Sequence, residues 1–156
     1  MTIANRIKQH LDSAGARYDT VAHPRTSTAM ESAEAAHVPG DDLAKSVVIH
    51  HENGYMLAVI PSSHQVDLST LQGLVGRRIG LATEREIDDL FEDCETGAIP
   101  PIGSAYGLPT MIDDSLRGHD AIWFEAGDHR TLVHMSGADF DHLMRGVRHE
   151  TFSHHM

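Results

Sequence analysis

The sequence of 156 residues contains little cysteine, little lysine and no long apolar run, and each shortage excludes a class of protein. Its only cysteine, Cys94, cannot form a disulfide within the chain, which excludes a disulfide-stapled scaffold and is typical of the reducing cytoplasm. No apolar run approaches the roughly 20 residues that a membrane-spanning helix needs. The first residues, Met1 to Lys8, lack the apolar centre of a signal peptide. The sequence therefore predicts a cytoplasmic protein without a membrane partner.

Lysine occurs only at Lys8 and Lys45, and acidic residues outnumber Lys and Arg by 23 to 12, which gives a formal net charge of −11. Non-specific nucleic-acid binding depends on neutralising many phosphates with basic side chains. Any RNA partner would therefore have to be held locally. Lys45 begins an apolar run that continues to Ile49. A lysine in such a run either extends its ammonium to water or meets an anion, such as a phosphate or a developing oxyanion.

Motifs of several enzyme classes are absent. The sequence has no Gly-x-Ser-x-Gly nucleophile elbow, no phosphate-binding loop and no dinucleotide-binding glycine pattern. Cys94 lies between Asp93 and Glu95, and neighbouring carboxylates disfavour the thiolate that a catalytic cysteine needs. These absences argue against a covalent enzyme nucleophile.

The thirteen histidines do not show the spacing of a metal motif. His50 and His51 are adjacent on a predicted strand and would point to opposite faces. His149 and His154 lack the four-residue spacing of the helical zinc motif. The last two histidines lie in the segment 148–156, which we expect to be frayed. The sequence thus predicts neither a metal centre nor a cofactor.

Periodicity and turn residues predict one domain over residues 1–156, with no internal repeat or long linker. The predicted helices cover residues 3–14, 28–38, 66–74, 83–91 and 136–144. The predicted strands cover residues 18–21, 45–50, 55–60, 78–82, 110–112, 121–124 and 131–135, with a hairpin turn at Asn53-Gly54. Because strands and helices do not alternate strictly, we expect an α/β domain of the α+β type. Its mixed, mostly antiparallel sheet would be packed by helices, unlike a Rossmann fold.

The segment from Gly97 to Gly103 reads Gly-Ala-Ile-Pro-Pro-Ile-Gly and fits no regular element. Two adjacent prolines restrict the backbone and remove two amide donors, while the flanking glycines allow sharp turns and close approach. Such a stiff loop can hold a small polar group through its few free amides. A rigid connector between two strands is an equally good interpretation.

His129 lies in the polar turn Asp128-His129-Arg130, between Gly127 and a predicted strand. Turns commonly collect such residues, so a site role for His129 competes with an ordinary turn. Met30 and Ile99 are candidates for the walls of a pocket, although each would also suit a plain core.

Together these residues resemble the YbaK family of trans-editing aminoacyl-tRNA deacylases, which is related to the editing insertion of bacterial prolyl-tRNA synthetases. The resemblance runs from about Ile3 to Met144. The pieces that carry it, in order, are His23-Pro24, Thr28-Ala29, Ala44-Lys45-Ser46-Val47-Val48, Leu57-Ala58-Val59-Ile60-Pro61, Val66-Asp67-Leu68, Ala82-Thr83-Glu84, the segment 97–103 and Phe124-Glu125-Ala126-Gly127-Asp128-His129.

The resemblance implies a central barrel-like sheet and a pocket for the 3′ end of a mischarged tRNA. It assigns the essential side chain to Lys45, places the loop from Gly97 to Pro101 at the aminoacyl pocket, and puts His129 close to the site. Lys45, Gly97 and His129 are therefore the predicted catalytic residues. The predicted substrate-binding residues are Met30, Ser46, Ala98, Ile99, Pro100, Pro101, Gly103 and Gly127.

The implied activity is hydrolysis of the aminoacyl ester at the acceptor end of tRNA, and an aminoacyl-tRNA synthetase is a candidate second partner. An activated ester requires a positioned water and charge stabilisation more than a protein nucleophile, with the amides near Gly97, Ala98 and Gly103 as candidate oxyanion donors. The residue that follows the essential lysine varies between subclasses of the family, and here it is Ser46. The resemblance therefore does not identify the amino acid of the substrate. Two alternatives are a non-catalytic binding module for aminoacyl-tRNA or a small molecule, and a hydrolase of small aminoacyl esters.

Overall fold

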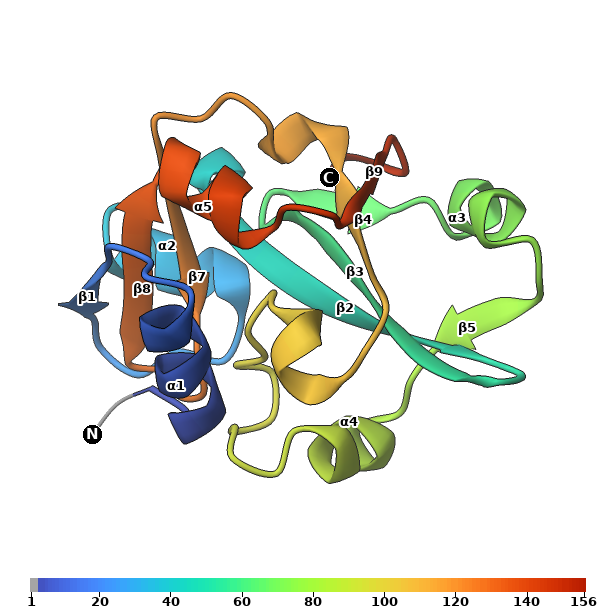
Figure 1. Cartoon of the computed structure of the whole chain (residues 1–156), viewed down its shortest axis with the longest axis horizontal. Helices are drawn as coiled ribbons and strands as arrows, with labels where there is room; N and C mark the ends of the chain where they lie inside the picture. Colours follow the sequence, from blue (N-terminus) through green and yellow to red (C-terminus); the bar gives the residue numbers. More distant parts are fainter. Residues whose placement is uncertain (1–2) are drawn as a thin grey trace.

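A mixed sheet of eight strands organises the chain, for which a computed structural model describes residues 3–156 (Figure 1). The strand order is β1-β8-β7-β2-β3-β6-β9, and β5 also pairs with β2. The bounds are β1 (Asp19–Ala22), β2 (Leu43–His51), β3 (Gly54–Pro61), β5 (Ile79–Leu81), β6 (Thr110–Asp113), β7 (Ala121–Glu125), β8 (Thr131–Ser136) and β9 (Arg148–Glu150). The pairs β2–β7, β3–β6 and β6–β9 are parallel and the others antiparallel, which confirms the predicted mixed sheet.

Short helices surround this sheet. They are α1 (Asn5–Ser13), α2 (Ala29–Ala35), α3 (Leu68–Val75), α4 (Glu84–Leu90) and α5 (Gly137–Leu143), with single 3₁₀ turns η1 (Gly40–Asp42), η2 (Gly103–Tyr106) and η3 (Asp114–Leu116). In Figure 1, α1 and α5 lie beside β7 and β8, while α3 and β5 lie near the far end of the β2–β3 hairpin. No helix within residues 3–156 has both the length and the apolar character to span a bilayer.

Local signals place several element ends where the sequence predicts them. Thr83 and Glu86 form the complete capping box at the start of α4. The Thr28 side chain accepts a hydrogen bond from the Glu31 amide at the start of α2. Gly76 adopts the left-handed conformation that ends α3.

The β2–β3 hairpin forms where the Asn53-Gly54 signal predicts one and is the longest pairing of the sheet. Its two turn residues are Glu52 and Asn53, and Gly54 begins β3 opposite His51. Its register sets Lys45 opposite Ile60 and Ser46 opposite Val59. Because successive strand residues point to opposite faces, this register determines which side of the sheet each of the two polar side chains occupies.

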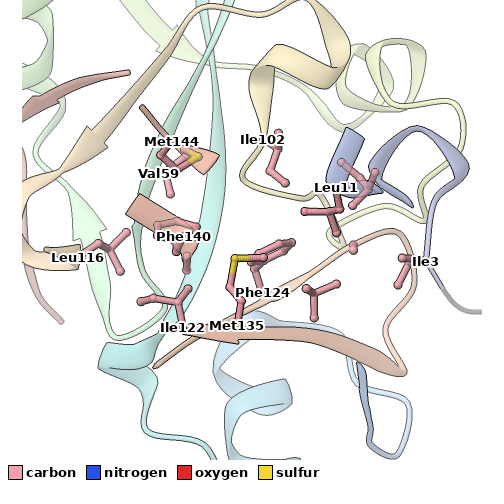
Figure 2. Packing of buried hydrophobic residues seen from close by; sticks show 14 of the residues in the cluster. Ile3, Leu11, Val59, Ile102, Leu116, Ile122, Phe124, Met135, Phe140 and Met144 are labelled. Carbon is pink, nitrogen blue, oxygen red and sulfur yellow. The ribbon is translucent and has the colours of Figure 1, made fainter. Parts of the chain in front are cut away.

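The largest core cluster packs α1 and α5 against β7 and β8 (Figure 2). Ile7 and Leu11, which recur at helical spacing, are fully buried. Phe124 of β7 and Phe140 of α5 meet with ring centroids 6.2 Å apart. Ile102 joins the same cluster, so the end of the diproline loop is anchored in the core.

The prediction that residues 148–156 are frayed is wrong. Strand β9 pairs with β6, and β10 (Ser153–His155) pairs with β4 (His64–Val66) to form a second, two-stranded sheet. Phe152 is fully buried, and its amide donates to Asp113 Oδ1 over 2.8 Å. The segment is too short and polar to show a periodic pattern. Its order comes from long-range pairing and from one buried ring.

Candidate active site

A cavity of about 400 Å³ lies between the start of α2, strand β2 and the diproline loop. Five of the predicted site residues line it: Met30, Lys45, Ser46, Gly97 and Ile99. Glu125 and Met156 also line it, and the sequence analysis proposed neither. The volume is in the range of small-molecule sites. Residues far apart in the sequence therefore form one chamber, as the site hypothesis requires.

Lys45 brings a cation to this cavity. Its half-buried ammonium contacts the Ser62 carbonyl oxygen at 3.3 Å, and it forms no ion pair with any carboxylate in the described part of the chain. Burial lowers the pKa of this ammonium. A charge held away from water without an opposite charge costs free energy. An anion that enters the cavity would therefore bind favourably beside the Lys45 ammonium.

Ser46 attaches the diproline loop to the sheet. Its hydroxyl donates to the Pro100 carbonyl oxygen over 2.9 Å. The neighbouring Ala98 amide donates to the Glu95 carbonyl at 3.0 Å, and the Ala98 carbonyl accepts from the Gly127 amide. The prediction that the Ala98 amide serves an oxyanion is wrong, because that donor already holds the loop.

Gly97 is required by both conformation and space. Its φ of +85° favours glycine, and a Cβ there would lie 3.2 Å from Cε1 of His129. The loop therefore passes directly against the His129 ring. This contact joins the cavity to a buried polar cluster behind it.

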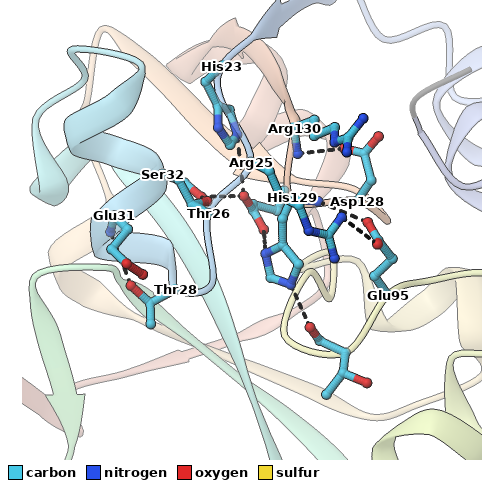
Figure 3. Close-up of polar contacts among 12 residues, drawn as sticks. His23, Arg25, Thr26, Thr28, Glu31, Ser32, Glu95, Asp128, His129 and Arg130 are labelled. Atoms are coloured by element: carbon cyan, nitrogen blue, oxygen red, sulfur yellow. Dashed lines mark hydrogen bonds and ion pairs between the residues drawn. The ribbon is translucent and has the colours of Figure 1, made fainter.

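That cluster centres on Glu125, whose carboxylate lies between the rings of His23 and His129. Figure 3 shows these two rings together with the Ser32 side chain. Glu125 Oε1 is 3.5 Å from His23 Nε2, and Glu125 Oε2 is 3.3 Å from His129 Nδ1. Ser32 donates its hydroxyl to Oε1 and contacts Thr26 with the same oxygen. We call these residues, His23, Ser32, Glu125 and His129, the Glu125 cluster; all four are buried.

The hydrogen-bond directions require a proton inside this cluster. His129 Nε2 bonds the Thr96 carbonyl and His23 Nδ1 bonds the Pro24 carbonyl, so these nitrogens carry the hydrogens. With both rings neutral and Glu125 ionised, each carboxylate oxygen would face a nitrogen lone pair in a buried position. One proton therefore resides on a ring nitrogen or on the carboxyl group.

Burial raises the pKa of the Glu125 carboxyl to about 7. Glu125 and Lys45 both line the cavity. A carboxyl group that can exchange a proton near neutral pH therefore lies in the same cavity as the Lys45 cation. This pairing of a fixed cation with a titratable acid is typical of an enzyme site rather than of a plain core.

Residues 23–143 match the family model described as the aminoacyl-tRNA editing domain. The chain belongs to this family. The match confirms the resemblance that the motifs suggested, and it includes all the residues of the Glu125 cluster as well as Lys45 and the diproline loop.

A curated relative is the multifunctional Ser/Thr-tRNA deacylase ProXp-y of Escherichia coli, 36% identical over 90 residues. The matched region is 56% of this chain and 53% of that protein, so the editing domain spans about half the length of the curated relatives it matches. A solved structure provisionally described as a trans-editing enzyme for prolyl-tRNA synthetase superposes with a TM-score of 0.83 at 27% identity, covering 96% of this chain and 95% of that one. A second, described only as hypothetical, reaches 0.84 at 18% identity, covering 96% and 100%, and shows the shared fold.

The remaining predicted residues of the editing domain do not line the cavity. His129 lies behind Gly97 in the Glu125 cluster. Pro100 accepts the Ser46 hydrogen bond, and Pro101 follows it in the buried part of the loop. Gly103 packs against Thr110 and Leu108 with no room for a side chain, and a Cβ at Gly127 would lie 3.0 Å from Ala4. These residues, like Ala98, hold the diproline loop in position rather than line the cavity.

Sequence reasoning missed Glu125 and His23 as members of the site. Glu125 ends an apolar strand, and His23 precedes a proline, so each has an ordinary local explanation. The available signal was a carboxylate at the buried end of a strand, which requires a partner wherever it lies.

Proposed function

We propose that the editing domain hydrolyses the ester bond of mischarged aminoacyl-tRNA and releases the amino acid and the free 3′ end of the tRNA. The observation that carries this proposal is the Lys45 ammonium, which pairs with no carboxylate of residues 3–156 and lies at a cavity beneath the diproline loop. The name of the Escherichia coli relative and that of the solved structure point to the same class of reaction.

The chemistry needs no covalent enzyme intermediate. Water attacks the ester carbonyl carbon, the carbonyl electrons move to its oxygen, and the ribose oxygen leaves with a proton that the water gives up. Lys45 would stabilise the negative charge of the developing oxyanion or of the terminal phosphate. Glu125 would hold a proton at the cavity wall during this exchange.

The hydroxyl and thiol side chains near the cavity are engaged in hydrogen bonds or protonated, which favours water as the attacking group. The Ser46 hydroxyl donates to Pro100, and Thr28 accepts from the Glu31 amide at the helix start. Burial raises the pKa of the Cys94 thiol to about 12, so it is protonated at neutral pH, and it does not line the cavity. A bound water is therefore the simplest attacking group.

The substrate is a small amino acid on the acceptor end of tRNA. A synthetase pocket discriminates a single methylene by only about 1–3 kcal/mol, so smaller amino acids are attached in error and removed at a second site. The walls formed by Met30, Leu43 and Ile99 limit the side chain that the cavity accepts. The net charge of −11 confines recognition to a few phosphates. Prolyl-tRNA synthetase is the proposed source of the mischarged tRNA.

The test is deacylation of tRNAs carrying Ala, Cys, Ser, Thr and Pro, measured in parallel with a minimal aminoacyl ester. We expect turnover of at least one small mischarged substrate, with the correctly charged tRNA spared. Equal rates on the minimal ester would indicate a general esterase instead. Binding of charged tRNA without any turnover would indicate a non-catalytic module of the same fold, the second candidate function.

A further inference from the structure

Three side chains capable of binding a metal ion meet outside the cavity: Asp41 of η1, His64 of β4 and His155 of β10. One ligand atom from each lies within 4.8 Å of the other two. The register of the small sheet pairs His155 directly with His64, and His155 Nε2 is 3.0 Å from Asp41 Oδ1. The proposed deacylation uses none of these groups.

Neighbouring hydroxyls orient two of the three side chains. The Ser153 hydroxyl bonds His64 Nδ1 at 2.8 Å, and the Ser63 hydroxyl donates to Asp41 Oδ1. A hydrogen bond on one ring nitrogen of histidine leaves the other nitrogen as the metal ligand, which is the usual arrangement around bound metals. His64 is buried, whereas Asp41 and His155 are exposed, so an ion has a path from solvent to the cluster.

We propose that Asp41, His64 and His155 bind one divalent transition-metal ion, with Zn²⁺ as a fitting occupant. Two imidazoles and one carboxylate suit a borderline ion of this kind and leave a fourth position for water. Ligand atoms around a tetrahedral zinc stand roughly 3.4 Å apart, given bonds of about 2.0–2.1 Å. Since the three ligand atoms already lie within 4.8 Å of one another, small shifts of the exposed Asp41 and His155 side chains would reach that geometry.

The bound ion would fasten the C-terminal strand beside the active cavity. Ser62 and Ser63 directly precede His64, and their hydroxyls donate to the Gly40 carbonyl and to Asp41 Oδ1. The Ser62 carbonyl contacts the Lys45 ammonium, and the Ser63 carbonyl accepts the Met156 amide at 3.0 Å. Met156 lines the cavity. The ion would therefore tie β10 to β4 and hold Met156 at the cavity wall, as a structural rather than a reacting group.

The experiment strips the full chain with a chelator and then titrates Zn²⁺ against a chromogenic chelator, alongside thermal unfolding and the visible spectrum of the Co²⁺ form. We expect one equivalent of bound ion, a rise in Tm and a four-coordinate Co²⁺ spectrum. Asp41→Asn and His155→Ala should each weaken binding at least tenfold and abolish the rise in Tm. Both positions are exposed, so neither variant should prevent folding.

His154→Ala is the matched control, because His154 is the adjacent histidine of β10 and contacts Gln65 and Asp67 instead. It should bind Zn²⁺ as the unmodified chain does. Equal Zn²⁺ affinity of His155→Ala and the unmodified chain would overturn the proposal, as would an equal loss in His154→Ala. These readouts are independent of deacylation, so they stand or fall separately from the proposed function.

Discussion

Nδ1 of His129 lies 3.3 Å from Oε2 of Glu125, and neither atom has a hydrogen-bond partner elsewhere in the described part of the chain. His23 Nε2 also lacks a partner and lies 3.5 Å from Glu125 Oε1, the oxygen that accepts the Ser32 hydroxyl. An acid between two imidazoles in a buried site must share a proton with them. The Glu125 cluster thus makes the wall of the cavity sensitive to pH.

Lys45→Ala should slow deacylation by roughly a hundredfold or more, because the variant removes the cation that stabilises developing negative charge. Its stability should be unchanged or slightly higher, since a half-buried ammonium without a counter-ion is lost. Single-turnover deacylation and thermal unfolding measure the two effects. Lys8→Ala is the control, because Lys8 is exposed and paired with Asp12 on α1. A Lys45→Ala rate within threefold of the unmodified rate would remove Lys45 from the mechanism.

Glu125→Gln should change how stability depends on pH. The folded-state pKa of Glu125 is raised from 4.5 to about 7 by burial, so the folded state binds the proton more tightly than the unfolded state does. Its contribution is therefore fully present below pH 4.5 and is lost as the pH rises to about 7. The loss should be on the order of 1–3 kcal/mol.

Denaturant unfolding of the unmodified chain and Glu125→Gln across this pH range measures the difference. Both proteins retain His23 and His129, so a difference between the two curves comes from the carboxyl group at position 125. Glu34→Gln is the control, because Glu34 is an exposed carboxylate of α2 outside the Glu125 cluster. Parallel curves for the unmodified chain and Glu125→Gln would contradict the shared proton.

Gly97→Ala should destabilise the fold by about 1–3 kcal/mol and reduce deacylation, because the positive φ is strained for alanine and the added methyl presses on His129. Gly146→Ala is a matched control. Gly146 has the same φ of +85° but open space around its Cα, so that variant reports strain alone. If the two variants lose equal amounts of unfolding free energy and of deacylation rate, the contact between the loop and His129 does not contribute to function.

Ser46→Ala removes the hydrogen bond that holds Pro100 to β2. We expect a loss of about 1 kcal/mol in unfolding free energy, since a typical hydrogen bond contributes that much. A loosened loop should also lower kcat/KM, and Ser69→Ala, an exposed serine of α3, should change neither quantity. Full activity in a destabilised Ser46→Ala would show that the loop needs no such attachment.

Phe152→Ala should cost about 3–5 kcal/mol of stability, the usual range for a fully buried ring. His154→Ala, two residues away and exposed, should stay within about 0.5 kcal/mol of the unmodified chain. Chemical denaturation checks both values. Equal, small effects would mean that the C-terminal strands are marginal in solution.

The sequence by itself determined the elements that depend on neighbouring residues. The hairpin around Asn53-Gly54 and the start of α4 at Thr83 follow from turn and cap chemistry, which acts over a few residues. The ordered motifs around Lys45 and the diproline loop also sufficed to indicate the family. Such local and motif signals survive in the sequence because they do not depend on how distant segments meet.

Only the tertiary structure decided which charged groups lack partners and which share them. Nothing near Lys45 in the sequence shows that its ammonium meets a carbonyl rather than a carboxylate, and nothing near Glu125 shows that His23 and His129 enclose it. The C-terminal strands were likewise invisible, because their order depends on pairing with β6 and β4. Burial, charge pairing and long-range strand pairing are properties of surroundings, and a residue acquires its surroundings only when the chain has folded.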